Sequence, residues 1–137
     1  MKHSTPVTAE TIDHWVRTAA QACDAKKGLD TVIIEVGSVL AITDYFVITS
    51  APNSRLVRTI ADSVEEAVKA IGGPGPLRVE GLSDLTWVLV DYGDWVVHVF
   101  DSETRRFYDL ERLWKDMPRL AWEPLVPVSV DDEGSSD

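Results

Sequence analysis

Apolar positions recur along this chain with two different spacings, and each change of spacing marks the boundary of a predicted element. Apolar side chains return every three or four residues over 9–27 and 52–71, which is typical of amphipathic helices. Runs rich in β-branched and aromatic residues favour strands at 32–36, 45–49, 77–80, 87–91 and 95–100. The pattern therefore predicts a helix, two strands, a second helix, three strands and two short helices, the last over 110–117.

Turn and capping residues agree with these boundaries. Thr8 is expected to cap the first helix, and Gly28 supplies its stop signal. Pro52 falls in the first turn of the second helix, where a missing N–H costs little, and the Gly/Pro run 72–76 ends that helix. Asp109 is expected to cap the last short helix.

The strongest local signal is a β-hairpin. Its two strands, 87–91 and 95–100, flank a three-residue connection with Gly93 at its centre. The second strand is apolar on both faces of its pleat except at His98, so we expect it to be covered on both sides near the middle of a sheet. The predicted fold is α/β, with a mixed five-stranded sheet covered by helices.

Charge changes the picture of what this domain can bind. The 137 residues carry a formal net charge of −10, and four of the acids lie in the last seven residues. The remainder is also acidic, so it would repel phosphate backbones and attract a basic protein surface. We expect one folded domain over 1–120, an acidic and flexible tail over 121–137, and no direct sequence-specific binding of nucleic acid.

Other features of the composition indicate the cytoplasm. No apolar run approaches the roughly 20 residues that span a bilayer, and the first residues lack the apolar core of a signal peptide. The single cysteine, Cys23, excludes an internal disulfide and a multi-cysteine metal site. Its helical spacing from Trp15 and Val16 predicts that it is buried.

One arrangement suggests catalysis but lacks a required group. Gly37 and Ser38 precede Asp44 at a strand start, as in nucleotidyltransferases, which hold divalent metal with two carboxylates two residues apart. Phe46 occupies the second of these positions. Asp91 lies on another strand, and Asp44 with Asp91 would make a poor magnesium site. We therefore expect no metal, no cofactor and no enzyme, with a residual nucleotidyltransferase or nucleotide-binding module as the alternative.

Two further polar features have a structural interpretation beside a functional one. His98 lies on a packed strand without a nucleophile nearby in sequence, which favours a hydrogen-bonded core residue over a catalyst. The segment 50–55 opens the second helix, whose free N–H groups would bind an anion. Capping by Ser50 or Ser54 explains that segment equally well and is the preferred interpretation.

Several separate blocks of the sequence resemble the ribosomal silencing factors, the RsfS or Iojap family. The blocks are 44–50 with 54–55 and 60–62, then Gly81 with 87–91 and 93–94, then 97–100, Arg106, Tyr108, 110–111 and 113–114. The resemblance covers roughly residues 9–114. It implies a nucleotidyltransferase-like fold without the metal-binding carboxylate pair, and no enzymatic activity.

The resemblance also implies a function and a partner. Members of the family bind the large ribosomal subunit through ribosomal protein L-fourteen and block joining of the small subunit, which represses translation when nutrients are scarce. The acidic character of this chain suits a basic ribosomal protein. A homodimer is compatible with the family, and the sequence leaves the oligomeric state open.

Residue roles follow from this expectation. Binding hot spots favour large aromatic side chains, which makes Trp87, Tyr108 and Trp114 candidates for apolar contacts, supported by Leu110. The other predicted contacts are polar: Asp91, Asp94 and Glu111 would pair with basic side chains, and His98 would donate a hydrogen bond. Core packing is the alternative for the tryptophans, Trp95 and Trp114 above all, and Arg106 has an ion pair with Glu103 or Asp109 as its alternative.

Overall fold

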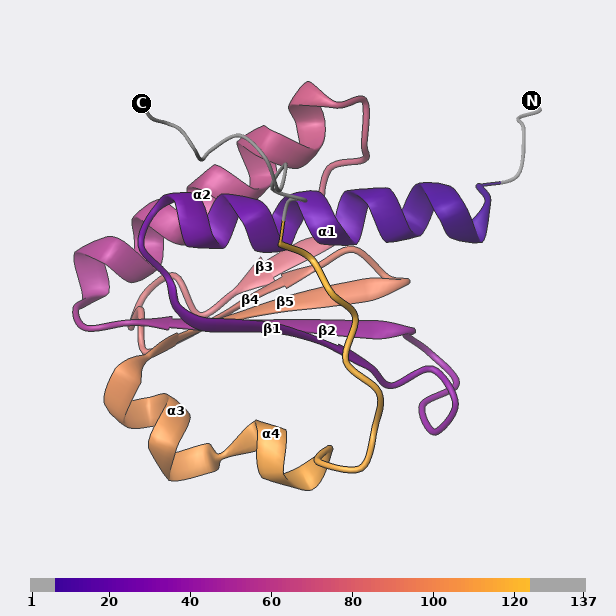
Figure 1. Ribbon diagram of the computed structural model, residues 1–137. Helices are drawn as coiled ribbons and strands as arrows, with labels where there is room; N and C mark the ends of the chain where they lie inside the picture. Colours follow the sequence, from indigo (N-terminus) through magenta and orange to yellow (C-terminus); the bar gives the residue numbers. More distant parts are fainter. Residues whose placement is uncertain (1–6, 124–137) are drawn as a thin grey trace, which may run out of the picture.

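A computed structural model of the chain describes residues 7–123. Its elements are α1 (Ala9–Ala25), β1 (Leu29–Glu35), β2 (Tyr45–Ala51), α2 (Ser54–Ala70), β3 (Arg78–Glu80), β4 (Trp87–Asp91), β5 (Trp95–Asp101), α3 (Ser102–Tyr108) and α4 (Leu110–Leu113). One sheet lies between two helical layers, with α1 and α2 on one face and the short helices α3 and α4 on the other (Figure 1). No helix among the described residues is long and apolar enough to cross a membrane.

The five strands lie in the order β1-β2-β5-β4-β3, which confirms the predicted mixed sheet. β2 and β5 are parallel, and the other neighbouring pairs are antiparallel. β5 therefore occupies the centre, as its apolar character on both pleat faces predicted. Its register places His98 between Ile48 of β2 and Leu89 of β4.

The main hydrophobic core fills the space between the sheet and the α1/α2 layer. Both helices turn an apolar stripe to the sheet, and β5 contributes the fully buried Val97 and Val99. Cys23 lies in this core at 0% exposure, as its spacing predicted. A second, smaller cluster on the α3/α4 side is centred on Ile34, Ile48 and Phe100.

The caps of two helices differ from those predicted. The Thr8 side chain accepts from the Thr11 backbone N–H at 3.1 Å, as predicted, but α2 is capped by Asn53, whose Oδ1 accepts from the Leu56 N–H at 2.9 Å. Neither Ser50 nor Ser54 is the cap, because Ser50 is buried at the end of β2 and Ser54 is already helical.

Asp109 also has a different role from the predicted one. Its φ of 47° places it in the left-handed region, where it ends α3 and turns the chain into α4. Its side chain makes no capping hydrogen bond to α4. The prediction that this carboxylate caps the last helix is therefore wrong, because the backbone turn between two helices determines its conformation.

The segment 118–122 crosses the edge of β1 and joins the two helical layers (Figure 1). Glu35 donates its N–H to the Pro118 carbonyl at 2.9 Å, and Leu120 donates to the Ile33 carbonyl at 3.0 Å. Trp122, two residues beyond the predicted domain boundary at 120, is only 9% exposed and packs in the main core. The rest of the predicted tail, 124–137, lies outside the described residues.

Candidate functional site

Two of the predicted contact residues, Trp87 of β4 and His98 of β5, form a hydrogen-bonded pair. The indole Nε1–H of Trp87 donates to Nδ1 of His98 at 3.1 Å. The Trp87 ring also stacks on Phe100, with ring centroids 4.8 Å apart. All three side chains point to the α3/α4 side, since alternate residues of neighbouring strands share a face.

Burial fixes the protonation state of His98. The residue is 5% exposed, and this desolvation lowers its pKa to about 4, so the imidazole is neutral near pH 7. Because Nδ1 accepts from Trp87, the single ring proton must lie on Nε2. That Nε2–H has no partner among the described residues. The structure thus confirms a hydrogen-bonded core residue whose one ring N–H has no acceptor within residues 7–123.

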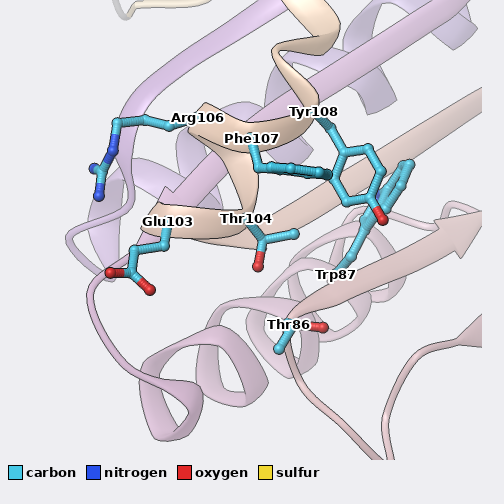
Figure 2. A pocket seen from close by; sticks show the side chains of 7 residues that line it. All are labelled: Thr86, Trp87, Glu103, Thr104, Arg106, Phe107 and Tyr108. Carbon is cyan, nitrogen blue, oxygen red and sulfur yellow. The ribbon is translucent and has the colours of Figure 1, made fainter.

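Helix α3 adds an aromatic surface beside Trp87. Tyr108 packs against Trp87 with ring centroids 4.9 Å apart, and Phe107 meets Tyr108 edge to face at 5.0 Å. Tyr108 is 54% exposed and Phe107 is 79% exposed. Figure 2 shows these rings together at one side of an open hollow, with Glu103 and Arg106 on the side away from Trp87. We call Trp87, Phe107 and Tyr108 the aromatic shelf. Phe107 was not among the predicted contacts, although its exposure is the largest of the three.

The two apolar residues predicted as contacts on α4 and at its end contribute mainly to packing. Leu110 and Trp114 are half-buried against the smaller core, and Trp114 meets Phe46 edge to face with centroids 5.9 Å apart. The core-packing alternative therefore describes Trp114 better than the contact role. It describes Trp95 fully, since Trp95 is 1% exposed.

Glu111 has an internal partner that the sequence did not indicate. Its Oε2 accepts from Nη2 of Arg105 at 2.6 Å, and Arg105 is only 8% exposed. The same guanidinium donates to the Leu29 and Asp30 carbonyls at 2.8 and 2.7 Å, where β1 shifts register. Arg105 therefore fastens α3 and α4 to the sheet. Its neighbour Arg106 is exposed and, among the described residues, forms no ion pair with Glu103 or Asp109.

The carboxylates of the two hairpin aspartates differ in whether other groups of the described chain already bind them. Asp91 accepts from Nε of Arg78 at 3.1 Å and from the Gly93 N–H at 2.8 Å, so its carboxylate is already engaged. Asp94 is exposed, and within residues 7–123 no side chain pairs with its carboxylate, while its backbone carbonyl accepts from the Asp44 N–H at 2.7 Å. Of the two, Asp94 is therefore the acid without an internal partner in the described part of the chain.

The position where a nucleotidyltransferase would hold metal is apolar here. The ring of Phe46 packs edge-on against His98 with centroids 4.6 Å apart, where a second carboxylate would be needed. Within residues 7–123, no group of three or more His, Cys, Asp and Glu side chains could hold a metal ion. The domain presents exposed aromatic side chains and an acidic surface, which are typical of a protein that binds another macromolecule.

Comparisons with known proteins identify the family. The profile described as "Ribosomal silencing factor during starvation" matches residues 9–136. The Bacillus subtilis "Ribosomal silencing factor RsfS" is 36% identical over 103 residues, which are 75% of this chain and 86% of that protein. A crystal structure of a Chromobacterium violaceum protein, 28% identical, superposes with a TM-score of 0.72 over 88% of this chain and 96% of that one. A more distant relative, the mouse "Mitochondrial assembly of ribosomal large subunit protein 1", is 32% identical over 87 residues, 62% of this chain and 38% of that protein.

The chain belongs to the RsfS family of ribosomal silencing factors. The family silences ribosomes during starvation, binds the large ribosomal subunit and blocks the joining of the subunits, without enzymatic activity. This agrees with the resemblance noted in the sequence and with the aromatic ring in place of a metal ligand.

Proposed function

We propose that this chain blocks subunit joining by binding ribosomal protein L-fourteen on the large subunit, and that the aromatic shelf with Asp94 forms the contact. The observation that carries the proposal is the exposure of Phe107 and Tyr108 next to Trp87 on an acidic domain. Exposed aromatic clusters of this kind are typical binding hot spots. The acidic charge favours a basic ribosomal protein as the partner.

The internal partners divide the predicted contacts into two groups. Trp87, Tyr108 and Asp94 keep surface available for a partner, whereas Glu111 is paired with Arg105 and Trp114 is packed against Phe46. We expect Leu110 and Trp114 to act by supporting the shelf. Asp91 and His98 line a separate groove on the same face of the sheet. The cytoplasm stays our prediction for the compartment.

Co-sedimentation with isolated large subunits tests this proposal. Tyr108→Glu should weaken binding at least about tenfold, because it removes an aromatic contact and brings a desolvation cost to the interface. Val7→Glu is a matched control: Val7 is also 54% exposed, but it precedes α1 on the other side of the sheet. Equal binding by both variants would show that the shelf is not the contact.

A second measurement addresses silencing itself. The wild-type protein should lower the formation of joined ribosomes when it is mixed with large subunits before small subunits are added, as followed by light scattering. Tyr108→Glu should restore joining, and Val7→Glu should not. No observation favours the alternative of a nucleotide-binding module, and a thermal midpoint that rises with nucleotide and magnesium would be needed to support it.

A further inference from the structure

A groove lies on the same face of the sheet, on the other side of His98 from the aromatic shelf. Its volume is about 360 Å³. It lies between the loop 40–43 and strands β3 and β4, and its walls are mostly apolar. Its lining includes Ile42, Thr43, Leu77, Glu80, Asp91 and His98.

Two buried polar atoms of the groove have no partner among residues 7–123. They are Nε2 of His98, which is 5% exposed, and the hydroxyl of Thr43, which is 6% exposed. In the imidazole ring, Nε2 points away from Nδ1, and Nδ1 faces Trp87, which does not line the groove. The Nε2–H donor is therefore directed away from the shelf. A fixed donor and a hydroxyl that donates or accepts can serve one backbone carbonyl and one backbone N–H of a bound peptide.

The rim of the groove combines exposed apolar side chains with acids. Ile42 is 85% exposed and Leu77 is 74% exposed, which are high values for large apolar residues. Glu80 and Asp91 line the groove, and both lie within 3.5 Å of the same cation, Arg78. Asp44 and Asp94 directly follow lining residues and contact each other through their backbones. The rim thus has an excess of negative charge.

We propose that this groove holds an extended segment of the basic ribosomal protein that the aromatic shelf contacts. An apolar side chain of the segment lies between Ile42 and Leu77, and flanking lysine or arginine side chains meet Glu80 and Asp94. One peptide carbonyl accepts from His98 Nε2–H, and a peptide N–H donates to the Thr43 hydroxyl. The inference rests on the proposed function. A second copy of this acidic chain fits less well, since it would bring like charges together.

Charge-introducing variants on the rim test the apolar contact. Ile42→Glu and Leu77→Glu should each lower the affinity for isolated large subunits at least about tenfold while leaving the thermal midpoint unchanged, because both side chains already face water. Val39→Glu is the matched control, since Val39 is 59% exposed directly before the loop 40–43 and does not line the groove. Binding by both rim variants equal to that of Val39→Glu would overturn the proposal.

Thr43→Val tests the polar contact separately from stability. Replacing an unpaired buried hydroxyl by a methyl of the same shape should hold or raise the thermal midpoint. If the hydroxyl accepts from the partner, the same variant should still bind large subunits several-fold more weakly. An unchanged affinity would show that the hydroxyl takes no part in binding.

The proton of His98 gives a direct readout. The chain has three histidines, so the Nε2–H of His98 can be assigned in a ¹H–¹⁵N spectrum of the imidazole groups. Titration with purified ribosomal protein L-fourteen should shift this resonance and slow its exchange with water. If this resonance stays in place while the backbone amide resonance of Tyr108 shifts during the same titration, His98 is not part of the interface.

The outcomes separate this inference from the proposed function. If the wild-type protein does not co-sediment with large subunits, or Tyr108→Glu binds normally, the proposed function fails. If Tyr108→Glu binds weakly while Ile42→Glu, Leu77→Glu and Thr43→Val bind normally, the groove assignment alone fails. If the rim variants change only the self-association measured by sedimentation equilibrium, a second copy occupies the groove and the proposal is overturned.

Discussion

Trp87 and His98 are joined diagonally across the β4–β5 ladder, where Trp87 lies opposite Phe100 and His98 lies opposite Leu89. The indole N–H holds the imidazole in the tautomer that carries its proton on Nε2. The same pair separates the aromatic shelf from the groove, since Trp87 lines the hollow of the shelf and His98 lines the groove. One hydrogen bond therefore orients groups on both surfaces.

The buried state of His98 makes folding sensitive to mild acid. Its pKa is lowered by burial to about 4 in the fold, against 6.5 for an unperturbed histidine, so the unfolded chain takes up the proton first as the pH falls. The stability that the fold gains by keeping His98 neutral is fully present above pH 6.5 and is lost as the pH falls toward 4. Between pH 7 and pH 5, we expect the wild-type protein to lose about 2 kcal/mol of unfolding free energy through His98 alone.

Urea unfolding of His98→Asn at pH 7 and pH 5 separates the effect of His98 on the unfolding free energy from the effect of the titrating carboxylates. The asparagine Oδ1 can still accept from Trp87, but the side chain does not titrate. The variant should therefore lose about 2 kcal/mol less than the wild-type protein over this interval. Parallel losses in the two proteins would show that His98 is not neutralised by burial.

Arg105 should be far more sensitive to substitution than its neighbour. A lysine ammonium cannot make all the hydrogen bonds that the planar guanidinium donates to the Leu29 and Asp30 carbonyls and to Glu111. Arg105→Lys should therefore lower the unfolding free energy measured in urea by about 3 kcal/mol. Arg106→Lys makes the same chemical change at an exposed position and should stay within about 0.5 kcal/mol of wild type. Similar values for the two variants would contradict the anchoring role of Arg105.

Trp122 should stabilise the whole domain although it lies near the end of the described chain. It is 9% exposed, and its indole N–H donates to the Thr31 carbonyl at 3.0 Å. Trp122→Ala should cost about 3 to 5 kcal/mol through lost packing, measured by chemical denaturation. Trp122→Phe, which keeps a ring but removes the donor, should cost less. A midpoint unaffected by Trp122→Ala would mean that 118–122 is not part of the fold in solution.

Cys23 should resist thiol reagents until the domain opens. The side chain is fully buried, and desolvation raises the pKa of its thiol to about 12, so almost no thiolate is present at pH 8. Labelling with a chromogenic disulfide should be complete in urea and very slow in native buffer. Rapid labelling of the native protein would indicate that α1 separates readily from the core.

Local patterns predicted the elements because most of them are determined by nearby residues. The hairpin and the central position of β5 follow from apolar alternation and one short turn, and both were confirmed. The roles of Asp109 and Asn53 were missed, because several polar residues near a helix end compete and the backbone path decides between them.

The candidate site was only partly predictable for a different reason. The sequence indicated Trp87, Tyr108 and His98, and the fold brings them together. It did not indicate the ion pair of Arg105 with Glu111, because an arginine beside another arginine on a short helix gives no sign of burial. The groove was also missed, since Thr43 and Leu77 meet only through the sheet.

The helical layers on the two sides of the sheet are unequal, so the two sides should tolerate substitutions to different degrees in related proteins. Most fully buried side chains lie on the α1/α2 side, whereas the other side is left partly open above β4 and β5. Replacements of the exposed residues on the open side, such as Phe107 and Ile42, can therefore accumulate with little thermodynamic cost and follow changes in the partner. The core between the sheet and the α1/α2 layer must keep nearly the same side-chain volume. Adaptive substitutions should therefore gather on the α3/α4 side of the molecule.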